Sequence, residues 1–364
     1  MRFLHCADLH LDSKMMSNLT KEQAKERKKE LLRTFVRMVD FAKSHSVTAI
    51  LIAGDMFDSE RVTAVTRNLV RDVIASNPTI DFLYLKGNHD RDGFVSELEE
   101  IPSNLLLFDE NWTSYEYNNV VVTGLELSKA NQMVAFPSLV LEKNKFNIVM
   151  LHGQVADYLS QGAVETVSLN DLRNKNIDYL ALGHVHSLKK ERLDERGVYC
   201  YPGCLEGRGF DECGEKGFVL LEIDEETLTA SYKFVPFAYR NLYELAVDVT
   251  DVNTTQEANL RIENAISKTN YSSNSMVKIV LTGNVGVDSE IDCDFLQDSL
   301  QGYFYFEKVE NATKLSVSYE DYAGDVSLKG EFIRSVLASD LEENMKAEII
   351  HCGIQALSGE EIAE

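Results

Sequence analysis

Five clusters of polar residues with metal-binding side chains each follow a short apolar run. They are Asp8-Leu9-His10, Gly54-Asp55-Met56-Phe57-Asp58, Gly87-Asn88-His89-Asp90, His152-Gly153 and Gly183-His184-Val185-His186. Aspartate, histidine and asparagine form a mixed oxygen and nitrogen ligand set, which suits Mn, Fe or Zn better than Ca. Asp8 and His10 are two residues apart, as are His184 and His186, so in extended backbone each pair points to one side and can serve one site.

A site of this composition suits the hydrolysis of phosphodiesters. Two cations about 3.5 to 4 Å apart lower the pKa of a bridging water, hold phosphate oxygens and offset transition-state charge. A histidine that binds no metal can protonate the leaving oxygen. Any one cluster alone is more often a turn or a surface polar group, but five in this order indicate a functional site.

The apolar runs before the clusters predict the strands of a layered α/β domain over residues 1–240. Strands are expected at residues 2–6, 48–53, 82–85, 120–123, 147–151, 179–182 and 198–201, and helices at 21–44, 64–76 and 169–174. A hairpin over residues 218–235 closes the domain. The carboxyl ends of strands in such a fold converge on one edge, so distant residues can meet in one crevice.

The rest of the chain predicts a smaller domain and a helical end. Residues 241–325 show the order strand, helix, strand, helix and two strands, which suits a small α+β cap domain of the split βαβ type. Residues 326–364 predict two amphipathic helices with apolar residues at helical spacing, among them Phe332, Val336 and Leu337. This apolar face could dock a partner or pack on the cap domain.

The composition is that of a globular protein, with 44% hydrophobic and 26% charged residues among 364. The net charge of -23 argues against a protein that coats nucleic acid by counterion release, and residues 241–364 hold 8 Lys and Arg against 23 Asp and Glu. Without an apolar run of membrane-spanning length or a signal-like stretch, we expect a cytoplasmic protein with no membrane association. The six cysteines show no paired framework, so reduced thiols are expected rather than a zinc site at Cys200, Cys204 and Cys213.

The order of the five clusters resembles the signature of the calcineurin-like metallophosphoesterase superfamily. The segments 4–12 (LHCADLHLD), 201–210 (YPGCLEGRGF) and 215–217 (EKG) look more narrowly like SbcD-type bacterial DNA repair exonucleases. The resemblance covers residues 1 to about 240 well and the remainder in outline. It implies a four-layer αββα sandwich with a smaller α+β cap domain and C-terminal helices. It also implies an exonuclease or endonuclease that binds two divalent metal ions, with Mn favoured.

Carried over by position, the resemblance implies a role for each polar residue of the clusters. One metal would be held by Asp8, His10, Asp55 and His186, and the second by Asp55, Asn88, His152 and His184. A metal-bridging hydroxide would attack the phosphate, His89 would be the proton donor, and Asp90 would orient His89. Asp58 does not fit as a ligand, and some nucleases of the group carry a histidine at this position.

Basic residues near the clusters are candidates for binding substrate. Arg91 and Arg208 lie close to the site loops and could contact the scissile phosphate. Residues 21–37 hold seven basic and three acidic residues, and Arg61, Arg67 and Arg71 follow the second cluster. These residues could contact DNA or form a solvated helix face. The resemblance further implies an SMC-like coiled-coil ATPase as partner, and a homodimer formed through the first domain.

Two other functions remain open from the sequence. A small-molecule or nucleotide phosphodiesterase would use the same metals, although such an enzyme needs neither the cap domain nor the 205–210 loop. A non-catalytic docking subunit would have no physical need to keep all the metal-binding histidines and His89. A protein phosphatase of the superfamily is disfavoured, because Ser59-Glu60 follows Asp58 where Arg-Gly is expected.

Overall fold

The computed structural model describes residues 1–15, 19–58, 62–90, 94–157, 165–286, 289–316 and 322–358. The chain divides into two compact units, Met1–Asn241 and Leu242–Glu364. The expected cap domain and C-terminal helices both fall in the second unit. In the described part of the chain, no helix combines the length and apolar character that crossing a membrane requires.

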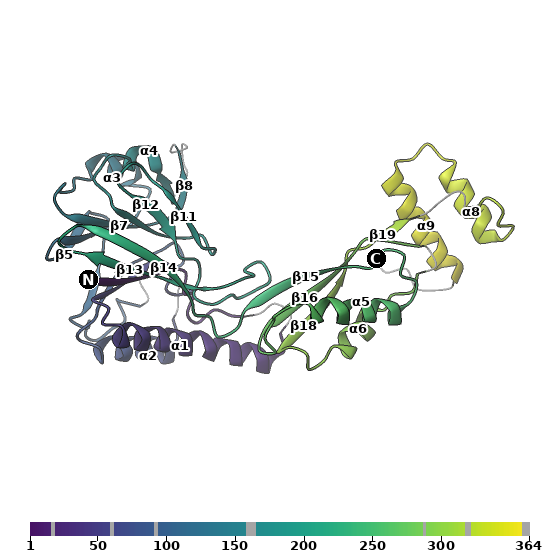
Figure 1. The fold of residues 1–364 in the computed structure, drawn as a ribbon, viewed down its shortest axis with the longest axis horizontal. Coiled ribbons are helices and arrows are strands. Elements are labelled where there is room, and N and C mark those ends of the chain that lie inside the picture. The colour runs from purple at the N-terminus through teal and green to yellow at the C-terminus, as the bar shows by residue number, and fades with distance from the viewer. Residues whose placement is uncertain are drawn as a thin grey trace. The chain divides into compact units, whose positions relative to one another are not determined.

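Two six-stranded sheets form the centre of the first unit (Figure 1). The first has the order β14 (Thr229–Pro236), β13 (Gly217–Asp224), β1 (Arg2–Cys6), β2 (Ala49–Ala53), β3 (Asp81–Leu85) and β4 (Leu105–Leu107). The second has the order β11 (Lys189–Arg192), β12 (Val198–Tyr201), β10 (Tyr179–Gly183), β7 (Phe146–His152), β6 (Val120–Gly124) and β5 (Thr113–Tyr117). A two-stranded ribbon, β8 (Gln154–Ala156) with β9 (Thr166–Ser168), follows β7 in the chain.

The two sheets pack face to face, and helices cover their outer faces. In β1, Phe3 belongs to the core between the sheets, whereas Leu4 belongs to the core beneath the helices. Helices α1 (Lys21–Ser44) and α2 (Ala64–Ala75) cover the first sheet, and α3 (Gln132–Ser138) and α4 (Leu169–Leu172) cover the second (Figure 1). Because both faces of each central strand are covered, those strands are continuous apolar runs. The predicted four-layer αββα architecture is confirmed.

The second unit has a parallel sheet, which corrects one expectation. Strands β15 (Leu242–Asp248), β16 (Met276–Thr282) and β18 (Phe306–Asn311) are neighbours in sequence order and all run parallel. Helices α5 (Thr255–Ser267) and α6 (Cys293–Ser299) make the crossovers, so the three strands form successive βαβ units. The split βαβ arrangement was wrong for these described residues, because β19 (Lys314–Ser316) pairs with β17 (Asn284–Gly286) instead of joining this sheet.

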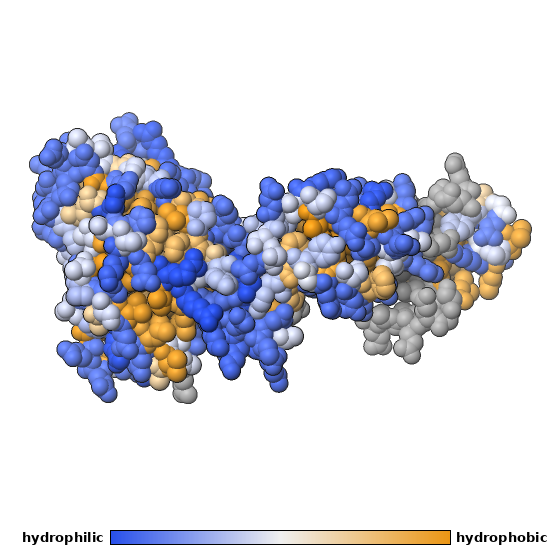
Figure 2. Space-filling view, turned by 60° about the horizontal axis from the view of Figure 1, so that its bottom comes forward, coloured by the Kyte–Doolittle hydropathy of each residue, from blue (hydrophilic) through white to orange (hydrophobic). Residues whose placement is uncertain are grey.

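The C-terminal segment forms the two expected helices, α8 (Leu328–Leu337) and α9 (Glu343–Ser358). A Cβ atom added to Gly353 would lie 2.2 Å from the ring of Phe332, so the two helices pack closely at this point. Part of the apolar face predicted from Phe332 is therefore used between α8 and α9. Other apolar side chains of this segment are exposed, namely Val326, Leu328, Met345 and Leu357. Figure 2 shows hydrophobic surface at the C-terminal end of the second unit.

Candidate metal centre

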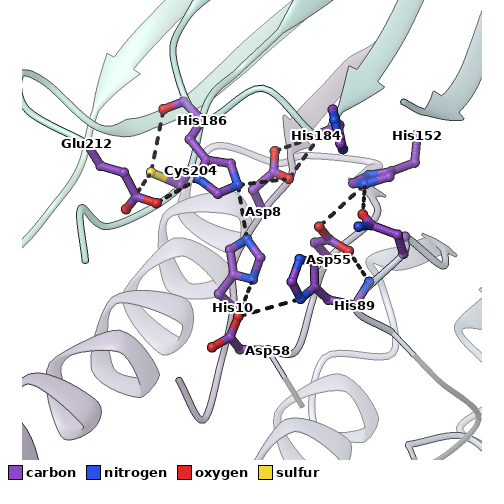
Figure 3. Close-up of polar contacts among 12 residues, drawn as sticks. Asp8, His10, Asp55, Asp58, His89, His152, His184, His186, Cys204 and Glu212 are labelled. Carbon is purple, nitrogen blue, oxygen red and sulfur yellow. Dashed lines mark hydrogen bonds and ion pairs between the residues drawn. The ribbon is translucent and has the colours of Figure 1, made fainter. Parts of the chain in front are cut away.

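The five polar clusters meet at the carboxyl ends of five strands of the first unit (Figure 3). Strands β1, β2 and β3 run parallel in one sheet, and β7 and β10 run parallel in the other. Each ligand-bearing loop leaves its strand at the same edge of the double sheet. The site is therefore built from both sheets, as the position of the clusters after apolar runs predicts.

The backbone of the ligand loops adopts conformations that L-residues rarely take. Asp8, His10, Asp55 and His184 have φ angles of 51°, 43°, 50° and 100°. Such left-handed conformations cost about 1–3 kcal/mol each and persist where the surrounding structure holds them. Here the peptide N–H groups of Asp8 and His10 donate to the carbonyl oxygens of Gly54 and Asp55 at 3.0 Å, which fixes the two loops against each other.

Two glycines allow the ligand loops to approach one another. A Cβ atom on Gly87 would lie 2.3 Å from Asp55 Oδ1, and one on Gly183 would lie 1.9 Å from the carbonyl oxygen of Ala53. These separations are far below van der Waals contact, so only glycine fits without a shift of the backbone. Close contact between the loops therefore requires glycine at both positions.

Asp8, His10 and His186 form the first group of candidate ligands. The Nε2 atoms of His10 and His186 face each other at 3.2 Å, and His186 Nε2 lies 3.7 Å from Asp8 Oδ1 (Figure 3). Metal–imidazole bonds of about 2.0–2.1 Å place two nitrogens on one cation at such a separation. Both carboxylate oxygens of Asp8 also accept the backbone N–H of His184, which aims the carboxylate.

Asp8, Asp55 and His152 form the second group. His152 Nε2 lies 3.4 Å from Asp55 Oδ2 and 3.0 Å from Asn88 Oδ1. Its Nδ1 lies 2.9 Å from the carbonyl oxygen of Ala53, so a proton on Nδ1 is held there and Nε2 faces the site. His184 joins neither group by its ligand atoms, although its ring packs edge-on against that of His152.

The electrostatics of the centre favour bound cations. Burial raises the pKa of Asp8 to about 6. Burial also raises the pKa of Asp55, but the hydrogen bond and charge of His152 outweigh burial and hold that pKa at about 2. The same pair raises the pKa of His152 to about 9 against the effect of burial. The cluster thus places two buried carboxylates beside imidazole nitrogens, a donor set that fits divalent cations.

His89 and Asp90 sit on the loop after β3 but point to different places. The backbone N–H of His89 donates to Asp55 Oδ1 at 2.9 Å, and its half-exposed ring lies at the rim of the site, with Nδ1 3.8 Å from Asp58 Oδ1. The buried carboxylate of Asp90 accepts backbone N–H groups, from Met56, Phe57 and Gly87. The carboxylate of Asp90 therefore holds the loop that carries His89, and its predicted role of orienting His89 stays a prediction.

Three further residues of the site were not recognised as such from the sequence. Asp58 lies between His10 and His89, with Oδ1 3.2 Å from His10 Nδ1. Glu212 contacts His186, and Ser13 donates to Asp58. The i,i+4 spacing of Arg208 and Glu212 was the only available signal, because every other partner is distant in sequence. Of the two substrate arginines, Arg208 lies beside these residues, and Arg91 falls outside the described residues.

Four of the basic residues proposed to contact DNA pair with other residues of the protein. The pairs are Arg27 with Glu30, Arg37 with the ring of Phe237, Arg67 with Glu97, and Arg71 with Asp72. Arg61 lies outside the described residues. Lys21, Lys25, Lys29 and Arg33 are exposed on α1, and their contact with DNA stays a prediction.

The fold and this constellation define a phosphoesterase, and the chain belongs to the calcineurin-like phosphoesterase family, whose model matches residues 1–188. One relative is the protein named uncharacterized metallophosphoesterase YhaO of Bacillus subtilis (strain 168), 27% identical over 77% of this chain and 71% of its own length. The DNA double-strand break repair protein Mre11 of Sulfolobus acidocaldarius is 23% identical over 96% of this chain and 95% of that protein. Among solved structures, TT1561 of Thermus thermophilus aligns with 64% of this chain and 98% of that chain, at 14% identity and a TM-score of 0.42.

Proposed function

We propose that this phosphoesterase is a two-metal phosphodiesterase that acts on DNA, of the SbcD type, with Mn as its metal. The observation that carries the proposal is the convergence of two ligand groups, sharing Asp8, beside His89. The similarity to the DNA repair protein Mre11, which extends over nearly the whole of both chains, supports DNA as the substrate class. An SMC-like ATPase partner and a homodimer stay predictions.

The residues divide the work of hydrolysis. As predicted from the sequence, Asp8, His10, Asp55 and His186 would hold one cation, and Asp55, Asn88, His152 and His184 the other. Bound cations would activate water and offset the charge of the phosphate. The imidazole of His89, which is 48% exposed, can reach a substrate at the rim and give its proton to the leaving oxygen. Asp90 keeps the His89 loop in place through the N–H groups of the two adjoining loops.

The test uses end-labelled linear duplex DNA with purified protein in Mn, with and without chelator. We expect His89→Asn to lower kcat by about 100-fold or more, because loss of a general acid costs about 10²–10⁴-fold. The matched control is His45→Asn, since His45 lies exposed at the end of α1, beside the amino end of β1 and not at the carboxyl ends of the strands where the site lies. Release of label should need Mn and His89, but not His45.

A parallel assay with bis-p-nitrophenyl phosphate separates the metal centre from the substrate. Cleavage of this ester together with intact DNA would reject DNA as the substrate of the isolated chain and favour a small-molecule phosphodiesterase. Absence of cleavage of either substrate together with absence of Mn binding would reject the enzyme altogether. Replacing Mn by Mg, Zn or Fe(II) in the same assay tests the choice of metal.

A further inference from the structure

Two ligand histidines each have a carboxylate behind them, on the side away from the candidate cation. Glu212 Oε1 lies 2.6 Å from His186 Nδ1, and Asp58 Oδ1 lies 3.2 Å from His10 Nδ1 (Figure 3). The opposite nitrogens of the same two rings are the Nε2 atoms that face each other at 3.2 Å. Each imidazole ring thus lies between a carboxylate and the candidate cation position.

The guanidinium of Arg208 joins the two carboxylates. Its Nη1 donates to Asp58 Oδ1 at 3.0 Å, and its Nη2 donates to Glu212 Oε1 at 2.8 Å. The backbone N–H of Arg208 also donates to Glu212 Oε2 at 2.7 Å. Arg208 thereby connects the loop after β2 with the 204–212 loop, whose residues are far apart in sequence.

The network is well enclosed. The exposed fractions of the side chains are 4% for Glu212, 21% for Arg208 and 24% for Asp58. Ser13 Oγ donates to Asp58 Oδ2 at 2.9 Å and supports the second carboxylate oxygen. A charge-assisted network of this kind, partly desolvated, holds its members in defined positions.

We infer that Asp58 and Glu212, bridged by Arg208, are positioning residues for the candidate metal ligands His10 and His186. Glu212 fixes the tautomer and orientation of His186 through its hydrogen bond to Nδ1, and Asp58 fixes the orientation of His10 through an ion-pair contact with Nδ1. A carboxylate that accepts from Nδ1–H keeps the proton on that nitrogen and leaves Nε2 with a free lone pair. Arg208 offsets the charge of both carboxylates, so neither is drawn to the cation in place of an imidazole. Arg208 acts on the metal centre and not on the substrate phosphate.

This inference deepens the proposed function and rests on its metal centre. The test is Mn affinity of the full chain, measured from the EPR signal of free Mn during titration. Glu212→Gln and Arg208→Gln should each weaken Mn binding by about 10- to 100-fold, the usual cost of losing such a partner. The control is Asp211→Asn, which removes an exposed carboxylate next to Glu212 and should leave the affinity unchanged.

Two further measurements test the network as a unit. The double variant Arg208→Gln/Glu212→Gln should bind Mn no more weakly than the worse single variant, because partners in one network are not additive. Glu212→Asp, which keeps the carboxylate, should recover part of the affinity. Additive losses, or no recovery, would contradict a shared positioning role.

A kinetic comparison distinguishes positioning from substrate binding. With bis-p-nitrophenyl phosphate at saturating Mn, Arg208→Gln should regain KM close to that of the wild type. A raised KM at every Mn concentration with unchanged Mn affinity would overturn the inference and return Arg208 to the substrate. Wild-type chain that binds no Mn would instead reject the proposed function. Thermal unfolding in chelator compares each variant with the wild type, and equal transitions exclude misfolding as the cause of weaker Mn binding. Asp58→Asn is included because Asp58 is more exposed than Glu212, so its replacement disturbs the fold least.

Discussion

At the scale of residues, the site concentrates backbone strain where its ligands are. The four site residues with positive φ angles lie on three different loops, and hydrogen bonds from the peptide N–H groups of Asp8, His10 and His184 hold these loops together. Gly87 and Gly183 serve the same end, because Gly87 lets the loops after β2 and β3 touch and Gly183 lets the end of β10 approach β2 of the other sheet. The geometry of the site therefore depends on the absence of side chains at these glycines as well as on the polar residues themselves.

The first prediction concerns Gly183. In Gly183→Ala the new methyl would meet the Ala53 carbonyl oxygen at 1.9 Å and His152 Nδ1 at 2.8 Å, so β2 or His152 must move. We expect a loss of about 1–3 kcal/mol in the free energy of unfolding of the first unit, as for other overpacked sites, and weaker Mn binding. Urea denaturation and Mn titration measure the two effects.

Gly324→Ala is the matched control for this change. A Cβ atom at Gly324 meets nothing within 4 Å, so this variant should unfold like the wild type. Equal stability and equal Mn affinity of Gly183→Ala and Gly324→Ala would show that the loops at the site are looser than their contacts indicate.

The residues that converge on the candidate site could be predicted from the sequence, whereas the contacts that support them could not. Asp8 and His184 each follow an apolar run, and a strand end is a local signal. The roles of Asp58, Arg208 and Glu212 depend on contacts between loops that are distant in sequence. Asp58 and Arg208, for example, are 150 residues apart. Asp58 was set aside because it did not fit as a ligand in the predicted two-metal scheme, yet it faces His10 in the fold.

At the scale of elements, α1 is held to the first sheet by buried charges as well as by apolar residues. Glu30, fully buried, accepts from Arg27 Nη1 at 2.6 Å and from Arg240 Nη2 at 2.7 Å. Arg27 Nη2 also donates to the carbonyl oxygen of Gly207 at 2.7 Å, and Glu206 accepts from Thr34 Oγ1 at 2.6 Å. One face of α1 thus anchors both the site loop and the last residues of the first unit.

The second prediction follows from this buried pair. Glu30→Ala removes the buried carboxylate that Arg27 and Arg240 share, and breaking a buried pair in this way costs about 3–5 kcal/mol. Glu26→Ala, on the exposed side of the same helix, should change the free energy of unfolding by less than about 0.5 kcal/mol. Urea denaturation of both variants measures the difference, and equal stability would show that the buried pair contributes nothing.

The helical pattern of α1 was predictable, but its use of charge was not. Periodic apolar residues and the cap at Thr20 mark the helix in the sequence. The same seven basic residues suggest a solvated or DNA-binding face, since a sequence does not show which arginine meets a buried glutamate. The second unit is a similar example. The order of its strands and helices along the chain was predicted, but the sequence did not show that β19 pairs with β17 and leaves β15, β16 and β18 as a three-stranded parallel sheet.

At the scale of the whole molecule, the metal ligands tie together distant parts of one unit only. Residues from Asp8 to His186 contribute to the centre, and all lie within Met1–Asn241. A cation bound to loops of both sheets stabilises the folded first unit against the unfolded chain, in which the ligands are scattered. The second unit has its own core and supplies none of the described ligand groups.

The third prediction is that metal binding stabilises the first unit alone. Mn at about 100 times its Kd should add about 2.7 kcal/mol to the free energy of unfolding of that unit, and chelator should remove it. The single tryptophan, Trp112, reports this directly, because its indole N–H donates to the Ala135 carbonyl oxygen within the first unit. Its fluorescence transition should move with Mn, whereas the part of the circular dichroism transition due to the second unit should not. Asp55→Asn, which removes a ligand, should abolish the shift, and equal shifts of both transitions would contradict a centre confined to the first unit.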